Sequence, residues 1–169
     1  DPRIKTTQAD FEAQFDLLMD IRDRTSEINE KVLTIRSIKK QVNTLTGLMK
    51  DSGFKKDEIK DAGKALTKSL TEIEESLIQV KSKSGQDPLN YPIKLDNKIA
   101  SLVWVVSGVD ARPTAQSYGV LDDLVSQSQV HYKKLDKVLT DDLFKFNNMV
   151  SDAGVPAVMI VPSEMSVER

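Results

Sequence analysis

The sequence predicts an all-α fold: an elongated antiparallel up-down-up-down four-helix bundle, with long first and last helices and an extended C-terminal tail. Apolar residues recur at alternating spacings of three and four along several segments, which is the pattern of amphipathic helices that share a core. Clusters of turn-forming residues separate these segments. Charged residues of both signs make up 30% of the 169 residues. This composition is typical of helix-rich soluble domains.

Charge and cysteine content exclude several classes of function. The formal net charge is −2, which argues against a nucleic-acid or anionic-membrane partner. The absence of cysteine excludes disulfides, zinc–cysteine sites and thiol catalysis. No apolar run has the length of a membrane span, so we expect no membrane insertion. Because the chain begins with Asp1 rather than Met, we interpret it as a piece of a longer protein.

Residues 8–50 are predicted to form the first helix. Thr7 is a candidate N-cap, and Asp10 completes a weak capping box. Such a helix is roughly 60 Å long, which a compact globule cannot cover. Its predicted core stripe consists of Phe11, Phe15, Leu18, Ile21, Thr25, Ile28, Val32, Ile35, Ile38, Val42, Leu45 and Met49.

Residues 57–82 are predicted to form the second helix, with acidic residues in the first turn and lysines at the end, as the helix dipole favours. Gly63 lies inside this segment, where it costs up to about 1 kcal/mol relative to alanine. It marks either close packing against the first helix or a kink.

Residues 93–107 are predicted to form the third helix. Its middle is apolar on nearly every side, so we expect it to be the most buried helix. Trp104 has two interpretations. It fills a gap between helices, or it forms part of an interdomain contact together with Val105.

Residues 114–153 are predicted to form the fourth helix, with Thr114 as N-cap. Its stripe consists of Tyr118, Leu121, Val125, Ser128, Tyr132, Leu135, Leu139, Asp142, Phe146 and Met149. Asp142 breaks the apolar pattern, and Leu143 is expected to take its packing role. Gly154 is expected to close the helix with a Schellman cap that brings Val155 to Val150.

Residues 1–6 are interpreted as a linker from a preceding domain, and residues 1–162 as one helical bundle domain. The stretch 155–162, which includes Val158, is expected to be extended and to lie against the bundle or a missing domain. Residues 163–169 are expected to be disordered.

Residues 83–92 form the central connection, which is rich in turn formers. Pro88 and Pro92 fix φ, and Asp87 and Asn90 can cap backbone N–H groups, so we expect a folded loop. Either Tyr91 packs on the end of the bundle, or the loop 85–92, with Tyr91 and Pro92, belongs to a docking surface for another domain.

Residues 81–95 (Lys-Ser-Lys-Ser-Gly-Gln-Asp-Pro-Leu-Asn-Tyr-Pro-Ile-Lys-Leu) closely resemble a segment near the C-terminus of large bacterial exported BNR-repeat, sortilin-like or glycosyl-hydrolase-like β-propeller proteins. Residues 1–3 (Asp-Pro-Arg), 15–18 (Phe-Asp-Leu-Leu), 113–118 (Pro-Thr-Ala-Gln-Ser-Tyr) and 153–158 (Ala-Gly-Val-Pro-Ala-Val) support the resemblance, which covers nearly the whole chain.

The resemblance implies a helical region that follows a propeller and a β-sandwich, which would be its partners. It implies a periplasmic, cell-surface or secreted protein. Any hydrolase activity would lie in the propeller, outside this chain. The expected function is therefore a non-catalytic accessory or interaction domain. The alternatives are a free-standing coiled-coil-type adaptor bundle and a passive part of a propeller hydrolase.

We find no catalytic, cofactor-binding or metal-binding motif, and we expect no cofactor. His131 is the single histidine and lacks a Glu at di-iron spacing or a nucleophile motif, so we interpret it as solvated. Adjacent carboxylates such as Glu74 and Glu75 diverge by about 100° on a helix, so they are interpreted as solvated. The candidate contact residues are Tyr91, Pro92, Trp104, Val105 and Val158.

Overall fold

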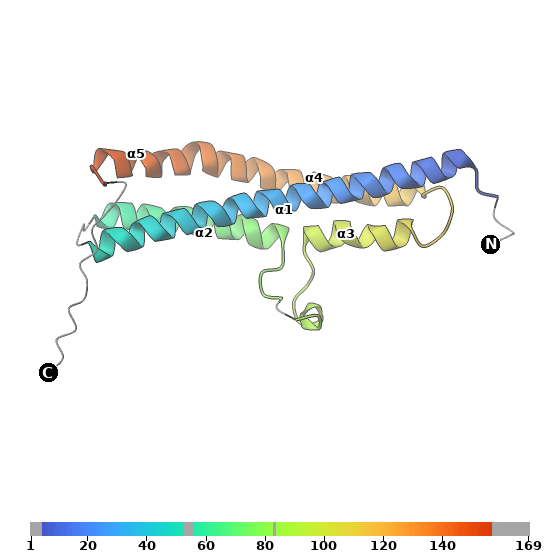
Figure 1. The fold of residues 1–169 in the computed structure, drawn as a ribbon, viewed down its shortest axis with the longest axis horizontal. Coiled ribbons are helices and arrows are strands. Elements are labelled where there is room, and N and C mark those ends of the chain that lie inside the picture. Colours follow the sequence, from blue (N-terminus) through green and yellow to red (C-terminus); the bar gives the residue numbers. More distant parts are fainter. Residues whose placement is uncertain (1–4, 53–55, 83, 157–169) are drawn as a thin grey trace. The chain divides into compact units, whose positions relative to one another are not determined.

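The computed structural model describes residues 5–52, 56–82 and 84–156, and these residues are all-helical, without strands. The segments are α1 (Gln8–Asp51), α2 (Asp57–Leu77), α3 (Leu95–Val106), and a fourth in which α4 (Ala115–Lys137), the π-helix η2 (Val138–Leu143) and α5 (Phe144–Asp152) follow one another (Figure 1). The prediction of an all-α helical bundle is confirmed. Residues 157–169, which include Val158 and most of the predicted tail, lie outside the described residues.

The chain divides into two compact units. Unit 1 comprises Asp1–Thr34 and Glu72–Lys134, and it contains the first part of α1, the end of α2, α3 and most of α4. Unit 2 comprises Ile35–Thr71 and Leu135–Arg169, and it contains the rest of α1, α2 and α4 together with η2 and α5.

Within unit 1, α1 and α4 run in the same direction. The Tyr118 hydroxyl donates a hydrogen bond to the carbonyl oxygen of Ala13 at 3.4 Å, 105 residues away in sequence. Farther along both helices, Lys31 Nζ lies 5.6 Å from the centre of the Tyr132 ring. The predicted up-down-up-down order requires the first and fourth helices to be antiparallel, so this order does not hold in unit 1. Apolar periodicity identifies the inward face of a helix but not its neighbours or their direction.

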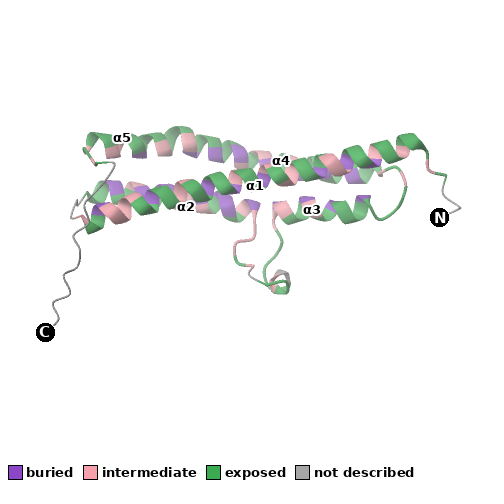
Figure 2. Cartoon of the chain, in the orientation of Figure 1, coloured by how far each residue is buried: buried purple, intermediate pink, exposed green. Residues whose placement is uncertain are grey.

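The core of unit 1 is built from one stripe of each helix (Figure 2). Its buried apolar residues are Leu17, Ile21, Ile28, Val32, Ile73, Leu77, Leu95, Ile99, Leu102, Val106, Leu121, Leu124 and Tyr132. The predicted stripe of α1 is wrong at its first two positions, because Phe11 and Phe15 are exposed and Gln14 is buried. Gln14 Nε2 donates to the carbonyl oxygens of Val106 and Val109, at 2.6 and 2.7 Å. The amide thus satisfies the carbonyl of Val106, which the end of α3 leaves without an intrahelical partner, and it also binds the turn that follows α3.

The core of unit 2 depends on a close approach at Gly63. A Cβ atom added to Gly63 would lie 3.1 Å from Thr46 Cγ2, 3.2 Å from Val42 Cγ1 and 3.3 Å from Phe146 Cε2. The close-packing interpretation of this glycine is therefore confirmed. The other buried apolar residues of unit 2 are Ile35, Met49, Ile59, Leu66, Leu70, Leu135 and Val138.

The predicted helix ends agree with the structure at three of the caps. Thr7 and Asp10 form the expected capping box, with N–H to side-chain oxygen distances of 3.0 and 3.3 Å. Thr114 Oγ1 accepts from the N–H of Ser117 at 3.2 Å. Gly154 has a φ of 65°, and the N–H of Val155 donates to the carbonyl oxygen of Val150 at 3.3 Å, as in a Schellman cap.

The sequence did not predict η2. Leu135 and Val138 are buried, and the next buried residue is Phe146. It lies eight positions after Val138, whereas a heptad pattern would place it seven positions after. The wider π-turns absorb the additional residue. As expected, Asp142 is exposed and Leu143 is the more buried of the two.

Candidate interaction surface

The connection between α2 and α3, residues 78–94, is a loop whose ends are held together. Gln79 Nε2 donates a hydrogen bond to the carbonyl oxygen of Pro92 at 2.8 Å. Lys81 Nζ lies 6.0 Å from the centre of the Tyr91 ring. Figure 1 shows this loop leading away from the helices of unit 1. A compact loop with adjacent ends is an Ω-loop, a type that is frequently functional. The second helix is shorter than predicted, because α2 ends at Leu77 and not at residue 82.

The inside of the loop is ordered by Asp87. Its carboxylate accepts from the N–H of Ser84 at 2.8 Å and from the Ser84 hydroxyl at 2.9 Å. The carbonyl oxygen of Asp87 accepts from the N–H groups of Asn90 and Tyr91, at 2.9 and 2.8 Å. These bonds surround the single 3₁₀ turn η1 (Asp87–Leu89). The prediction of a folded loop capped by Asp87 is confirmed.

The loop presents apolar side chains to solvent. Leu89 is 88% exposed, and Tyr91 is 37% exposed despite its contact with Lys81. Pro92 is exposed as well. Leu89 was not named individually among the contact residues, although it lies in the loop 85–92 that the sequence suggested as a docking surface. An apolar residue in a polar turn has no core within reach, which was a usable signal.

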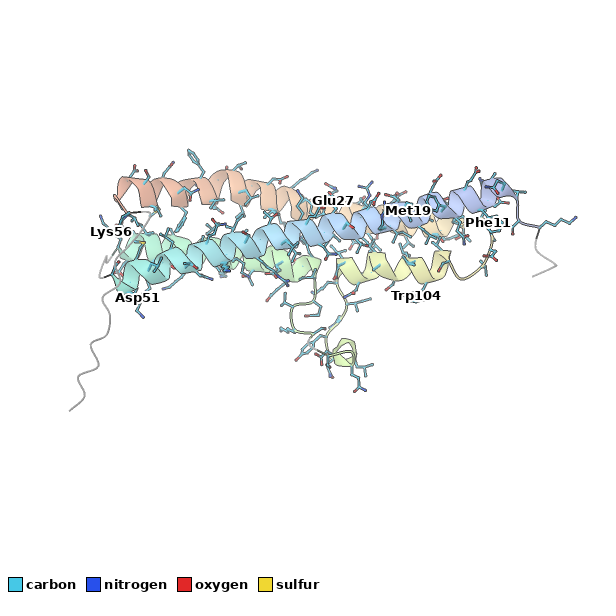
Figure 3. All side chains as sticks on the ribbon, viewed as in Figure 1. Phe11, Met19, Glu27, Asp51, Lys56 and Trp104 are labelled. Atoms are coloured by element: carbon cyan, nitrogen blue, oxygen red, sulfur yellow. The ribbon has the colours of Figure 1, made fainter. Side chains whose placement is uncertain are left out.

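α3 has a second exposed apolar site. Its buried residues Leu95, Ile99, Leu102 and Val106 lie on a single stripe, whereas Trp104 is 81% and Val105 64% exposed (Figures 2 and 3). At 100° per residue, Trp104 lies about 160° from Leu102, on the outer side of the helix. The expectation that α3 is the most buried helix is wrong, because only one of its sides packs against the other helices of unit 1. The gap-filling interpretation of Trp104 is wrong for the same reason.

The predicted contact residues that the structure describes form two pairs and not one cluster. Tyr91 and Pro92 belong to the loop, while Trp104 and Val105 lie in the last turn of α3, about 14 Å along the axis from Leu95. We name Leu89, Tyr91, Pro92, Trp104 and Val105 together the loop–α3 surface.

Lysines and a half-buried acid accompany this surface. Lys94 and Lys98 lie at the start of α3 and Lys81 lies in the loop. Burial raises the pKa of the Asp96 carboxyl, while the N–H groups of Asn97 and Asp96 act in the opposite direction. Its Oδ1 atom has no hydrogen-bond partner in the described part of the chain. Charges of both signs therefore accompany the surface, with the three lysines beside the carboxyl groups of Asp87 and Asp96.

Groups with acid–base potential lie elsewhere. His131 is half-exposed, and desolvation, with a smaller effect of Lys134, lowers its pKa. Glu74 is buried, so its interpretation as a solvated carboxylate is wrong, whereas Glu75 is exposed as expected. The described residues contain no group of three or more His, Cys, Asp or Glu side chains placed to hold a metal ion.

The described helices include none that is both long and apolar enough to cross a membrane. No protein-family model, no curated protein and no solved structure matches this chain.

Proposed function

We propose that this chain is a non-catalytic accessory and interaction domain, and that its loop–α3 surface contacts another domain of the same parent protein. The exposure of Trp104 carries the proposal. Tryptophan buries more apolar area than most residues, and it is enriched where two surfaces meet. On the outer side of α3 it packs against no core of its own unit, so its burial requires a partner.

The loop supports the same interpretation. A connector from α2 to α3 needs only soluble residues, yet this loop has internal hydrogen bonds and presents Leu89 and Tyr91 on an ordered frame. Such preorganisation lowers the entropic cost of binding. An ordered apolar loop is therefore better explained by recognition than by chain connection.

The partner follows from the resemblance stated above. In that family the helical region follows a propeller and a β-sandwich, so we propose these domains as the partners. The parent is then an exported bacterial protein that acts in the periplasm, at the cell surface or outside the cell. Under this proposal any chemistry belongs to the propeller, and the present chain hydrolyses no glycoside or peptide.

Binding in trans tests the proposal. The chain and the domains encoded immediately upstream are expressed separately, and their association is measured by calorimetry. The triple variant Leu89→Ser, Tyr91→Ser, Trp104→Ser is expected to weaken binding by roughly tenfold or more, because large buried anchors dominate interface energies.

Leu33→Ser is the matched control, since Leu33 is an exposed leucine of α1 in unit 1 and lies outside the loop–α3 surface. It is expected to leave the affinity unchanged. Equal affinities for the native chain and the triple variant would reject the surface. Absence of any association with the upstream domains would favour the free-standing adaptor.

A further inference from the structure

Three polar side chains at the start of α1 bind the connection between α3 and α4. Thr6, Asp10 and Gln14 recur at spacings of four, and the last two therefore lie on the same side of the helix. The Thr6 hydroxyl donates a hydrogen bond to the carbonyl oxygen of Asp110, 104 residues away in sequence. Asp10 Oδ1 forms an ion pair with Arg112 Nε at 3.1 Å. Distant parts of unit 1 are thus joined at several points.

Gln14 makes the most buried of these contacts, because only 8% of the residue is exposed. Its Nε2 atom reaches both the carbonyl oxygen of Val106, at the end of α3, and that of Val109, in the connection. A carboxamide suits this place, because its NH2 group carries two donors. Leucine has a similar volume without the donors, so it would leave the buried carbonyl of Val106 without this partner. Gln14 therefore fixes the end of α3 against α1.

Asp10 links the connection with the N-cap of α1. Its Oδ2 atom accepts from the N–H group of Thr7 at 3.0 Å and from the Thr7 hydroxyl at 2.7 Å, while Oδ1 faces Arg112. The hydrogen bonds from Thr7 and the charge of Arg112 lower the pKa of Asp10, so the carboxylate stays ionised at neutral pH. One carboxylate thus serves both the cap of α1 and its contact with the connection.

The connection also lies close to the exposed part of α3. A Cβ atom added to Gly108 would lie 3.0 Å from the carbonyl oxygen of Trp104, so the chain turns tightly against the last turn of the helix. The N–H group of Ser107 donates to the carbonyl oxygen of Val103 at 2.8 Å. α3 has only 12 residues, and a helix of this length depends on tertiary contacts for its stability. The contacts of the connection therefore affect the position of Trp104.

We propose that Thr6, Asp10 and Gln14 form a clasp that couples the start of α1 to the end of α3, where Trp104 and Val105 lie. Through the clasp, a change at the start of α1 alters the mobility of Trp104. The coupling is a property of unit 1 and does not depend on the proposed function. Its use, which is to orient the loop–α3 surface, rests on that function.

Trp104 reports on the clasp directly, because it is the only tryptophan of the chain. Time-resolved fluorescence anisotropy measures its local motion. Thr6→Val removes the hydroxyl and keeps the shape of the side chain, and the lost bond ends at Asp110, six positions after Trp104. We expect this variant to increase the amplitude of the fast motion of Trp104 at least twofold, because coupling travels through the connection.

Thr34→Val is the matched control, since Thr34 is an exposed threonine whose hydroxyl bonds within α1 itself. It is expected to leave the motion of Trp104 unchanged. An unchanged amplitude in Thr6→Val, or an equal increase in Thr34→Val, would overturn the proposal.

Hydrogen exchange measured by NMR tests the coupling at the backbone. Gln14→Leu and Thr6→Val are each expected to accelerate exchange of the Ser107 N–H several-fold, because both contacts hold the same connection. Gln127→Leu, which removes a side chain that bonds to Asp123 within α4, is the control. If only Gln14→Leu accelerates exchange at Ser107, the contacts act separately and the clasp is wrong.

Binding to the upstream domains separates the clasp from the proposed function. If Thr6→Val makes Trp104 mobile while neither the native chain nor the variant binds these domains, the proposed function fails and the clasp stands. If Trp104 stays fixed in Thr6→Val while the native chain binds, the clasp fails and the proposed function stands.

Discussion

At the scale of single residues, two positions connect the sequence most directly with stability. Gly63 lets α2 approach Val42, Thr46 and Phe146 closely, and His131 is the only histidine of the chain. The sequence alone singled out both residues. It could not predict the packing around Gly63, because the contacts of Gly63 come from stretches of the chain far from it in sequence.

Gly63→Val is expected to lower the free energy of unfolding by roughly 1–3 kcal/mol, which is the usual cost of overpacking. The valine side chain would meet Val42 and Thr46 of α1 as well as the ring of Phe146. Gly119→Ala on α4 is the control, because a Cβ there has nothing within 4 Å. Helix propensity predicts a gain of up to about 1 kcal/mol for it. Urea unfolding measures both variants, and a Gly63→Val variant as stable as the native chain would contradict the packing account.

His131 predicts a pH dependence whose sign follows from its lowered pKa. Near its ordinary pKa of 6.5 the unfolded chain takes up a proton, while the folded chain takes it up only at lower pH. The folded state therefore loses stability as the pH falls from above 6.5 through the lowered pKa. Thermal melting from pH 8 to 5 is expected to show a smaller decline for His131→Gln than for the native chain. Parallel curves would exclude this contribution.

At the scale of elements, the reliable predictions were those that depend on local chemistry. The caps at Thr7, Thr114 and Gly154 were predicted because each uses residues within a few positions of it. The end of α2 was placed too late, because Gln79 makes its bond to Pro92 across a loop. The direction of α4 relative to α1 in unit 1 could not be predicted, since the same apolar stripe serves either direction.

The π-helix predicts an unusual tolerance to deletion. η2 contains one residue more than the heptad pattern needs between Val138 and Phe146. Deletion of Thr140, which lies within η2, is expected to convert η2 to α-helix and to change the melting temperature by only a few degrees. Deletion of Gln127, an exposed residue of α4, rotates every following core residue by about 100° and is expected to be far more destabilising. Circular dichroism melting compares the two, and equal losses would show that η2 does not absorb an additional residue.

At the scale of the whole molecule, the residues that stabilise the fold differ from the apolar residues that are exposed to solvent. The buried residues of each unit explain its folding, and they leave Trp104 and Leu89 without a structural role in the described chain. Of the predicted contact residues, the sequence indicated Tyr91, Pro92, Trp104 and Val105 by their type and setting. It could not show that Trp104 faces away from the core, because a helix that is apolar on several sides does not reveal which side packs.

Hydroxyl-radical footprinting with mass spectrometry, comparing this chain alone with the proposed full-length parent protein, tests whether the loop–α3 surface is an interdomain contact. We expect Trp104 and Tyr91 to be oxidised readily in the isolated chain and to be protected several-fold in the full-length protein. Phe144, which is 62% exposed in unit 2, should react equally in both. If Trp104 reacts as readily in the full-length protein as in the isolated chain, the loop–α3 surface is not an interdomain contact.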